Sequence, residues 1–352
     1  MVARWRPGET FLAPLRVLRA MESLASGRGA EFRVDLALPG EADGFRFLAE
    51  VKGSGTPLQV QAAVHAITER VAKARQADAG DWWPLVVVPY LNPERLAELE
   101  RQCVSGVDVC GNGVVMVPGR LWIVRSGQPN QYPETRPLKD PFSGKSSWVG
   151  RILLTQSRWD SLTSLVAGIN QAGGEISLPQ ASKTIQALVD ELMVLRTPPA
   201  LRLQEPLRLL DRLGRAFVRP EYRIRRLLRL SAGTDWAASL AAVPGLRWAV
   251  TGETAVRKYA VFGEGGPWRV AVDDLAKAVA AIGGSLETVP AFADIELVET
   301  KDAAVYFQAV PDQEGKRWAS RVQCWLELQN GDARQQQAAA EVRAQILKEA
   351  GA

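Results

Sequence analysis

With 352 residues, the chain is too long for one ordinary compact core, so we expect two or three domains. Its 47% hydrophobic and 23% charged residues exclude global disorder. A formal net charge of +4 does not point to a partner by itself, and no 18-residue apolar stretch or signal peptide is found, so we expect a cytoplasmic protein with no membrane partner.

The first third of the chain alternates between strand-like and helix-like patterns. Leu12, Leu15 and Leu18 recur at helical spacing and predict a helix from Thr10 to Leu24. Strand patterns follow at Glu31 to Leu38, Phe45 to Val51, Pro84 to Tyr90, Val107 to Cys110, Val114 to Val117 and Leu121 to Val124. Two further helices are expected between them, one ending near Ala77 and one from Pro93 to Cys103. We therefore predict an α/β domain over residues 1–127 with a mixed sheet.

A Gly-, Pro- and Ser-rich stretch then predicts a linker over residues 128–147. Helices are expected from Trp148, from Ser161 to Ala172 and from Ser177, a candidate N-cap, to about Leu195. A turn at Thr197-Pro198-Pro199 and a short strand from Ala200 to Leu203 complete the order of a winged helix-turn-helix, predicted over residues 148–219.

Residues 220–352 are predicted to form a third, α/β domain. Its strand-like runs are Trp248 to Thr251, Trp268 to Val272, Ile295 to Glu299 and Val305 to Phe307, with helices between them and a last helix from Asp332 to Lys348. The overall prediction is an α/β multidomain protein.

Two cofactor classes are excluded by residue counts. Three scattered cysteines do not make a disulfide framework or a zinc knuckle, and the single histidine, His65, rules out a multi-histidine metal site. His65 lies on the apolar pattern of its helix, which favours a structural histidine. Any metal chemistry would use carboxylates, which favour Mg²⁺ or Mn²⁺.

Asp35, Glu50 and Lys52 form the one candidate catalytic cluster. Period-two geometry places Glu50 and Lys52 on one face of their strand, and Asp35 approaches both if the two strands pair. Two carboxylates can hold a divalent cation while a lysine activates water beside a phosphodiester. Three hypotheses remain open: an active site, a fold with lost activity that only binds DNA, and a simple surface ion pair between Glu50 and Lys52.

The strand–strand–helix order around Val34-Asp35 and Glu50-Val51-Lys52 resembles the PD-(D/E)XK nuclease superfamily. The resemblance implies a restriction-endonuclease-like fold, with Asp35 and Glu50 as metal ligands and Lys52 as the catalytic lysine. Gln61, or Gln59, is a further catalytic candidate by the same resemblance, and Glu22 is a possible extra ligand. Val34 stands where the superfamily usually has a proline. Whether the protein is a metal-dependent DNA endonuclease stays open.

The DNA-binding prediction depends on two other features. The expected recognition helix would expose residues that read base edges or phosphates, namely Gln180, Ser182, Lys183, Thr184 and Gln186. The segment from Arg196 to Arg229 contains ten arginines, Arg202 among them, and only three acidic residues. This excess of positive charge suits a polyanion such as double-stranded DNA. A solvated basic face is the alternative for this stretch. Winged helices also bind proteins or form homodimers, and that alternative stays open.

Four features occur in one order along the chain: Gly106-Val107-Asp108-Val109-Cys110-Gly111-Asn112, the linker, the expected winged helix and Ala249-Val250-Thr251-Gly252-Glu253. This combination resembles the AbiEi-type antitoxin and transcriptional regulator group. The resemblance implies a degenerate nucleotidyltransferase-like domain over residues 220–352, regulation of transcription and a cognate toxin as possible partner. Nucleotidyl transfer itself is disfavoured, because Asp273 and Asp274 are adjacent and a strand would direct them to opposite faces. The leading hypothesis is a sequence-specific DNA-binding regulator, ahead of a nuclease and of an antitoxin-like interaction module.

Overall fold

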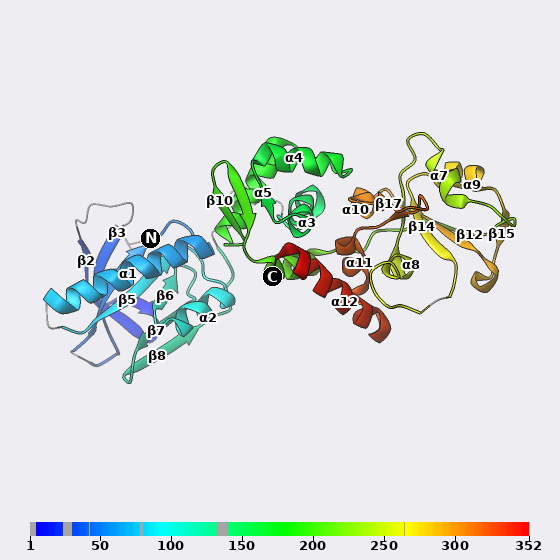
Figure 1. Ribbon diagram of the computed structural model, residues 1–352. Helices are drawn as coiled ribbons and strands as arrows, with labels where there is room; N and C mark the ends of the chain where they lie inside the picture. Colours follow the sequence, from blue (N-terminus) through cyan, green and yellow to red (C-terminus); the bar gives the residue numbers. More distant parts are fainter. Residues whose placement is uncertain are drawn as a thin grey trace. The chain divides into compact units, whose positions relative to one another are not determined.

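The computed structural model describes residues 5–23, 30–41, 43–77, 80–131, 140–263 and 265–351. The chain is a mixed α/β protein, as the sequence predicts, and it divides into two compact units (Figure 1). We call residues 1–137 the N-terminal unit and residues 138–352 the C-terminal unit. None of the described helices has the length and hydropathy needed to span a bilayer.

The described part of the N-terminal unit contains one eight-stranded sheet, whose strands lie in sequence order. The strands are β1 (Thr10–Leu12), β2 (Leu15–Ser23), β3 (Ala30–Ala37), β4 (Phe45–Val51), β5 (Trp82–Val88), β6 (Ser105–Asp108), β7 (Gly113–Val117) and β8 (Leu121–Arg125). Helix α1 (Pro57–Ala77) joins the parallel pair β4 and β5, and α2 (Pro93–Arg101) joins the parallel pair β5 and β6. The remaining neighbouring strands are antiparallel.

The helix predicted from Thr10 to Leu24 is wrong, because Thr10–Leu12 and Leu15–Ser23 form β1 and β2, and Leu24 lies outside the described residues. Leu15 and Val17 are buried, whereas Leu18 and Met21, which completed the helical spacing, are 40% and 55% exposed. Pro14 lacks the amide hydrogen that an interior helical turn requires. Pairing of β2 along most of β3 satisfies the backbone instead.

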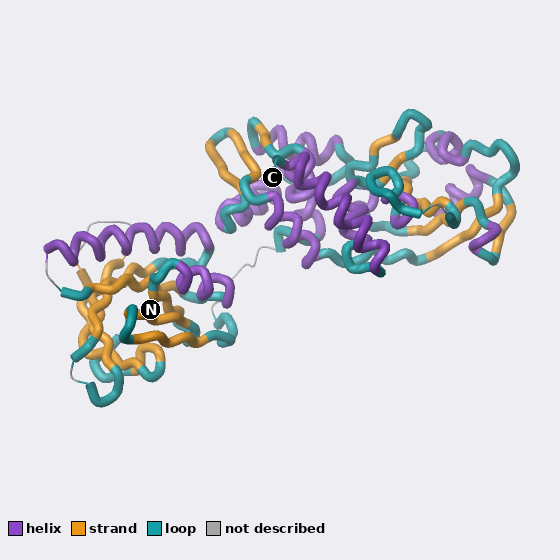
Figure 2. Tube along the Cα trace, turned by 60° about the horizontal axis from the view of Figure 1, so that its bottom comes forward, coloured by secondary structure: helices purple, strands orange, loops and turns teal. Residues whose placement is uncertain are grey.

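Each face of this sheet has its own apolar core. Under α1, Val60, Ala63 and Ile67 pack with Leu48 and Val86. The opposite core brings strands from both ends of the sheet together, since it contains Leu12, Leu15, Phe47, Val115 and Val117. The sheet therefore curls around this second core, as the orange strands of Figure 2 show, with α1 outside them.

The C-terminal unit begins with helices and a small sheet. Its elements are the 3-10 turn η2 (Gly144–Ser146), α3 (Ser147–Thr155), β9 (Arg158–Trp159), α4 (Leu162–Gln171), α5 (Leu178–Asp190), β10 (Val194–Thr197), β11 (Ala200–Leu203) and α6 (Pro206–Ala216). The predicted N-cap is confirmed: Ser177 accepts a hydrogen bond from the Gln180 amide at 3.4 Å. Strand order is β10-β11-β9, and β9 is a two-residue strand that the sequence pattern did not predict.

A second sheet follows, with seven strands among the described residues, in the order β15-β12-β16-β14-β13-β18-β17. In chain order the elements are β12 (Ile224–Arg229), α7 (Trp236–Ala241), β13 (Trp248–Val250), α8 (Gly252–Val256), β14 (Trp268–Val272), α9 (Leu275–Ile282), β15 (Ser285–Glu287), η3 (Pro290–Phe292), β16 (Ile295–Glu299), α10 (Ala303–Tyr306), β17 (Val310–Pro311), β18 (Arg317–Trp318), α11 (Arg321–Leu328) and α12 (Ala333–Ala350). The strand expected from Val305 to Phe307 is wrong, because Val305 and Tyr306 close the short helix α10.

The two segments expected as separate domains, 148–219 and 220–352, share one core. Val342 and Ile346 of the last helix pack in the same cluster as Val149 of α3 and Leu213 of α6. The chain therefore returns from the second sheet to the helices before it ends, and residues 138–352 form a single compact unit.

A buried polar network reinforces this connection. The Arg151 guanidinium on α3 donates to Gln323 Oε1 on α11 at 2.7 Å, and Gln323 Nε2 donates to Glu327 at 2.6 Å. Glu327 also accepts from the Thr251 hydroxyl, at 3.0 and 2.8 Å to its two oxygens, and from the Gly252 amide at 2.9 Å. Burial lowers the pKa of Arg151 to about 10, so it is still a cation at neutral pH.

Candidate functional site

The register of β3 against β4 decides whether the nuclease-like cluster forms. Asp35 is the cross-strand partner of Arg46, and the residue paired with Glu50 is Glu31. Asp35 is thus four residues from the position opposite Glu50, which is about 13 Å along a strand. The expectation that Asp35 approaches both Glu50 and Lys52 is wrong, although all three lie on the same face of the sheet.

Glu50 is fully buried and is ion-paired on both of its oxygens. Lys52 Nζ lies 2.7 Å from Glu50 Oε1, and Arg70 Nη1, from α1, contacts Glu50 Oε2. The ion-pair alternative is therefore correct for Glu50 and Lys52, but Glu50 is buried rather than on the surface, and Arg70 is a third member of the group. The sequence analysis missed Arg70, which follows the buried Ile67 by one helical turn, because only the packing of α1 on the sheet brings its side chain to Glu50.

The remaining nuclease-like candidates are not brought to this cluster. Gln59 and Gln61 are exposed on α1, outside its buried stripe, and His65 is exposed on the same helix rather than buried. Glu22 lies on β2 rather than on a helix, and its side chain is outside the described residues. Over the described ranges, no group of three or more His, Cys, Asp or Glu side chains could hold a metal ion. The donor set of Asp35 and Glu50 does not fit Mg²⁺ or Mn²⁺ here.

Helix α5 presents a polar face whose composition differs from the expected one. Lys183 and Gln186 are exposed, and Gln180 and Ser182 are half-buried. Thr184 is completely buried, and its hydroxyl donates to the Gln180 carbonyl at 3.0 Å. Its placement among the DNA-contacting residues is therefore wrong, because it belongs to the packed side of the helix, where Ile185 and Leu188 are also buried.

The hairpin β10–β11 carries exposed arginines. Arg196 and Arg202 are exposed, as the prediction required. Arg158 on β9 is the cross-strand partner of Arg202, and it too is exposed. Sequence reasoning missed Arg158, because a two-residue strand has no periodicity to detect. These cations form a basic surface next to α5, which packs against β10.

Six of the ten arginines from Arg196 to Arg229 have an ion-pair or hydrogen-bond partner among the described residues, and for Arg226 this partner is the carbonyl of the preceding Arg225. Arg208 Nη2 and Arg212 Nη1 lie 3.1 and 3.7 Å from Glu191 Oε2, and Arg225 Nε lies 2.6 Å from Glu296 Oε1. Arg219 donates to the Glu327 carbonyl at 3.0 Å, and Arg223 lies 3.8 Å from Glu221. The local charge excess therefore overstates the basic surface, and Arg158, Arg196 and Arg202 are its better-placed members.

No protein-family model, curated protein or solved structure gives a significant match to this chain.

Asp108, which belongs to the AbiEi-like stretch 106–112, and the adjacent Asp273 and Asp274 have structural roles in the fold. Buried Asp108 accepts hydrogen bonds from the amides of Leu91, Cys110 and Asn112, at 2.9, 2.9 and 2.8 Å, and so holds the turn after β6. Asp273 Oδ2 pairs with Arg247 Nε at 2.9 Å, whereas Asp274 caps α9 through the Lys277 amide at 3.1 Å. The two aspartates thus serve separate tasks.

Proposed function

We propose that this protein is a sequence-specific DNA-binding regulator that reads double-stranded DNA through a winged helix over α3, β9, α4, α5, β10 and β11. The observation that carries the proposal is the element order helix, short strand, two helices and hairpin, joined by the three-stranded sheet β10-β11-β9. In a winged helix this order has one recognition helix, here α5, and one wing, here the β10–β11 hairpin.

The exposed side chains support this assignment. An α-helix fits the major groove, where Gln186 can pair with a base edge and Lys183 with a phosphate or a guanine. On the wing, Arg196, Arg202 and Arg158 supply cations for the phosphate backbone or a narrow minor groove. The buried side of α5 anchors it, since Ala181, Ile185 and Leu188 lie in the core of the C-terminal unit.

The AbiEi-type grouping is retained as part of the proposal. Its order of an α/β domain, a DNA reader and a C-terminal α/β domain agrees with the element order of this chain. Under this proposal the partner is double-stranded DNA, and a toxin or a homodimer remains a prediction.

The experiment is a selection from a random duplex library with the full chain, followed by binding titrations at several salt concentrations. We expect an enriched motif, weaker binding as salt rises, and a salt slope that falls by about one for Lys183→Ala or Arg202→Ala. Arg215→Ala removes an exposed arginine from α6 and is the matched control. Failure to bind any duplex, or equal losses in Lys183→Ala and Arg215→Ala, would contradict the proposal.

The nuclease alternative is tested with the same protein. Plasmid DNA incubated with Mn²⁺ should stay intact, because both Glu50 oxygens are engaged by cations and Asp35 is distant. Metal-dependent nicking that disappears in Lys52→Ala would require the cluster to rearrange into a catalytic site.

A further inference from the structure

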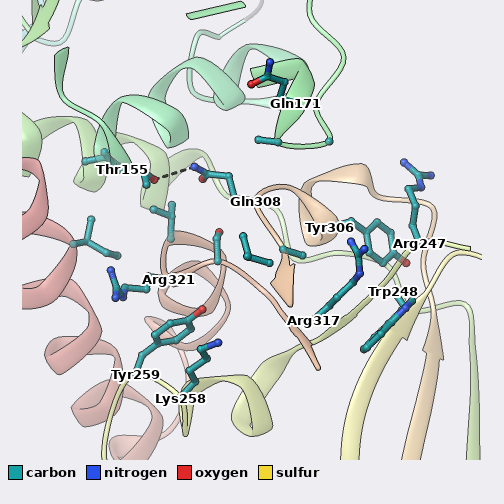
Figure 3. Close-up of a pocket in the computed structure, with 18 of the residues that line it drawn as sticks. Thr155, Gln171, Arg247, Trp248, Lys258, Tyr259, Tyr306, Gln308, Arg317 and Arg321 are labelled. Carbon is teal, nitrogen blue, oxygen red and sulfur yellow. Dashed lines mark hydrogen bonds between the residues drawn. The ribbon is translucent and has the colours of Figure 1, made fainter. Parts of the chain in front are cut away.

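The C-terminal unit contains a cavity of about 660 Å³ whose lining includes none of the side chains proposed above to contact DNA (Figure 3). Its walls come from the ends of α3 and α4, from β13 and β18, and from α12. Cavities of 300–1,000 Å³ are the usual size for small-molecule sites. On one side of the cavity Gln308 Nε2 donates to Thr155 Oγ1 at 3.0 Å, so the lining joins the helical and the sheet parts.

Positive charge dominates the lining. Of its four basic side chains, Arg321 pairs with Glu349 and Arg247 pairs with Asp273 at 2.9 Å. Lys258 and Arg317 form no ion pair with any residue in the part of the chain that the structure describes. Lys258 Nζ instead lies 5.3 Å from the centre of the Trp318 ring. The cavity thus has two cations that no carboxylate of the described residues pairs with.

Much of the remaining lining is apolar or aromatic, and polar groups come from Thr155, Gln171, Gln308, Ser320 and Glu349. Leu154, Val322 and Ile346 line the cavity together with Tyr259 and Tyr306. Two of the lining residues also have a buried polar atom without a hydrogen-bond partner within the described ranges, Gln308 Oε1 and Arg321 Nε, but both atoms are inaccessible to water and so do not face the cavity.

From these observations we propose that the cavity binds a small organic anion. The apolar walls bury its hydrocarbon or aromatic body, and Arg317 and Lys258 neutralise its carboxylate or phosphate. This inference does not depend on DNA binding, since it concerns the cavity alone.

The test is calorimetric titration of the full chain with four probes that share one apolar body: naphthoate, naphthyl phosphate, naphthylmethanol and naphthylmethylamine. We expect both anions to bind at least about tenfold more tightly than the neutral alcohol, and the cation to bind least. The stronger of the two anions then identifies carboxylate or phosphate as the natural acidic group. Equal affinities for anion and alcohol, or no binding of either anion at millimolar concentration, would overturn the proposal.

Variants locate the bound probe. Arg317→Gln and Lys258→Gln should each weaken the better anion about tenfold and leave the alcohol unchanged, because only the anion needs the lost charge. Arg226→Gln removes an exposed arginine from β12, outside the cavity, and should have no effect. Thermal unfolding of each variant checks that the fold is retained. A loss in Arg226→Gln equal to that in Arg317→Gln would show non-specific attraction and overturn the assignment.

Discussion

Replacing Glu50 by glutamine tests whether this buried carboxylate stabilises the N-terminal unit. The Glu50 side chain is 2% exposed and contacts two cations, whereas Lys52 and Arg70 are 17% and 35% exposed. Breaking a fully buried ion pair costs about 3–5 kcal/mol, because the remaining charge is left without a partner. Since Arg70 and Lys52 can regain some water, we expect Glu50→Gln to lower the local unfolding free energy by about 2–3 kcal/mol.

Hydrogen exchange measured by mass spectrometry on the full chain isolates this unit from the other one. Amides of β4 and α1 that exchange only through unfolding of the sheet should lose protection by roughly 30- to 150-fold, the equivalent of that free energy. Asp35→Asn is the matched control, because it also removes one carboxylate from the same face of the sheet. Asp35 is half-buried between the cross-strand positions of Arg19 and Arg46, so its loss should cost at most about 1 kcal/mol.

If Glu50 has a structural role, Glu50→Gln lowers the stability of the N-terminal unit, whereas a catalytic role predicts unchanged or higher stability. A carboxylate held for catalysis is often a source of strain, and its removal leaves a protein unchanged or more stable. If Glu50→Gln keeps or increases protection in β4 and α1, the stabilising role of the Glu50 carboxylate is refuted.

Three further predictions concern particular contacts. Thr184→Val should leave DNA affinity within twofold of wild type in a binding titration, because this side chain is buried away from the exposed face of α5; a large loss would contradict that orientation. Gly55→Ala should lower the denaturation midpoint by an amount equivalent to about 2 kcal/mol or more, since its Cβ would lie 2.1 Å from the Tyr90 carbonyl oxygen; an unchanged midpoint would be incompatible with this close approach. Of the three thiols, exposed Cys103 alone should react rapidly with a chromogenic disulfide reagent in the native protein. Rapid release of two equivalents of the reagent's chromophore would mean that a buried cysteine is also accessible.

The sequence predicted elements well where one strong pattern acted alone. Phe45–Val51 has the predicted bounds because its apolar residues are buried and Gly53 follows, and the helix ending at Ala77 has a continuous buried stripe. In Thr10–Leu24, leucines at three-residue spacing matched a helix by coincidence, and long-range pairing with β3 decided the structure. Local propensity is a weak prior when a neighbouring strand can satisfy the backbone.

The candidate site was harder to predict because alternation determines faces but not register. Asp35, Glu50 and Lys52 were correctly expected on one face, yet the pairing of β3 with β4 shifts Asp35 four residues from Glu50. A sequence motif contains no information on that shift unless the turn length fixes it. The sequence also does not decide which side chains of a helix are exposed, since Thr184 is buried although the neighbouring Lys183 is exposed.

Polar residues of the two units divide into those that hold the fold together and those that face solvent. Arg151 and Gln323 are 172 residues apart in the chain and buried together, and Asp108 and Glu327 are each buried with several donors. These buried side chains already form hydrogen bonds with one another or with the backbone, so a ligand would have to break existing hydrogen bonds to reach them. Lys183, Arg202 and Arg317 are exposed, and their charges can be neutralised without that cost. Function is therefore better sought on the α5 and hairpin surface and in the basic cavity than at the buried Glu50, although Glu50 has the more familiar motif.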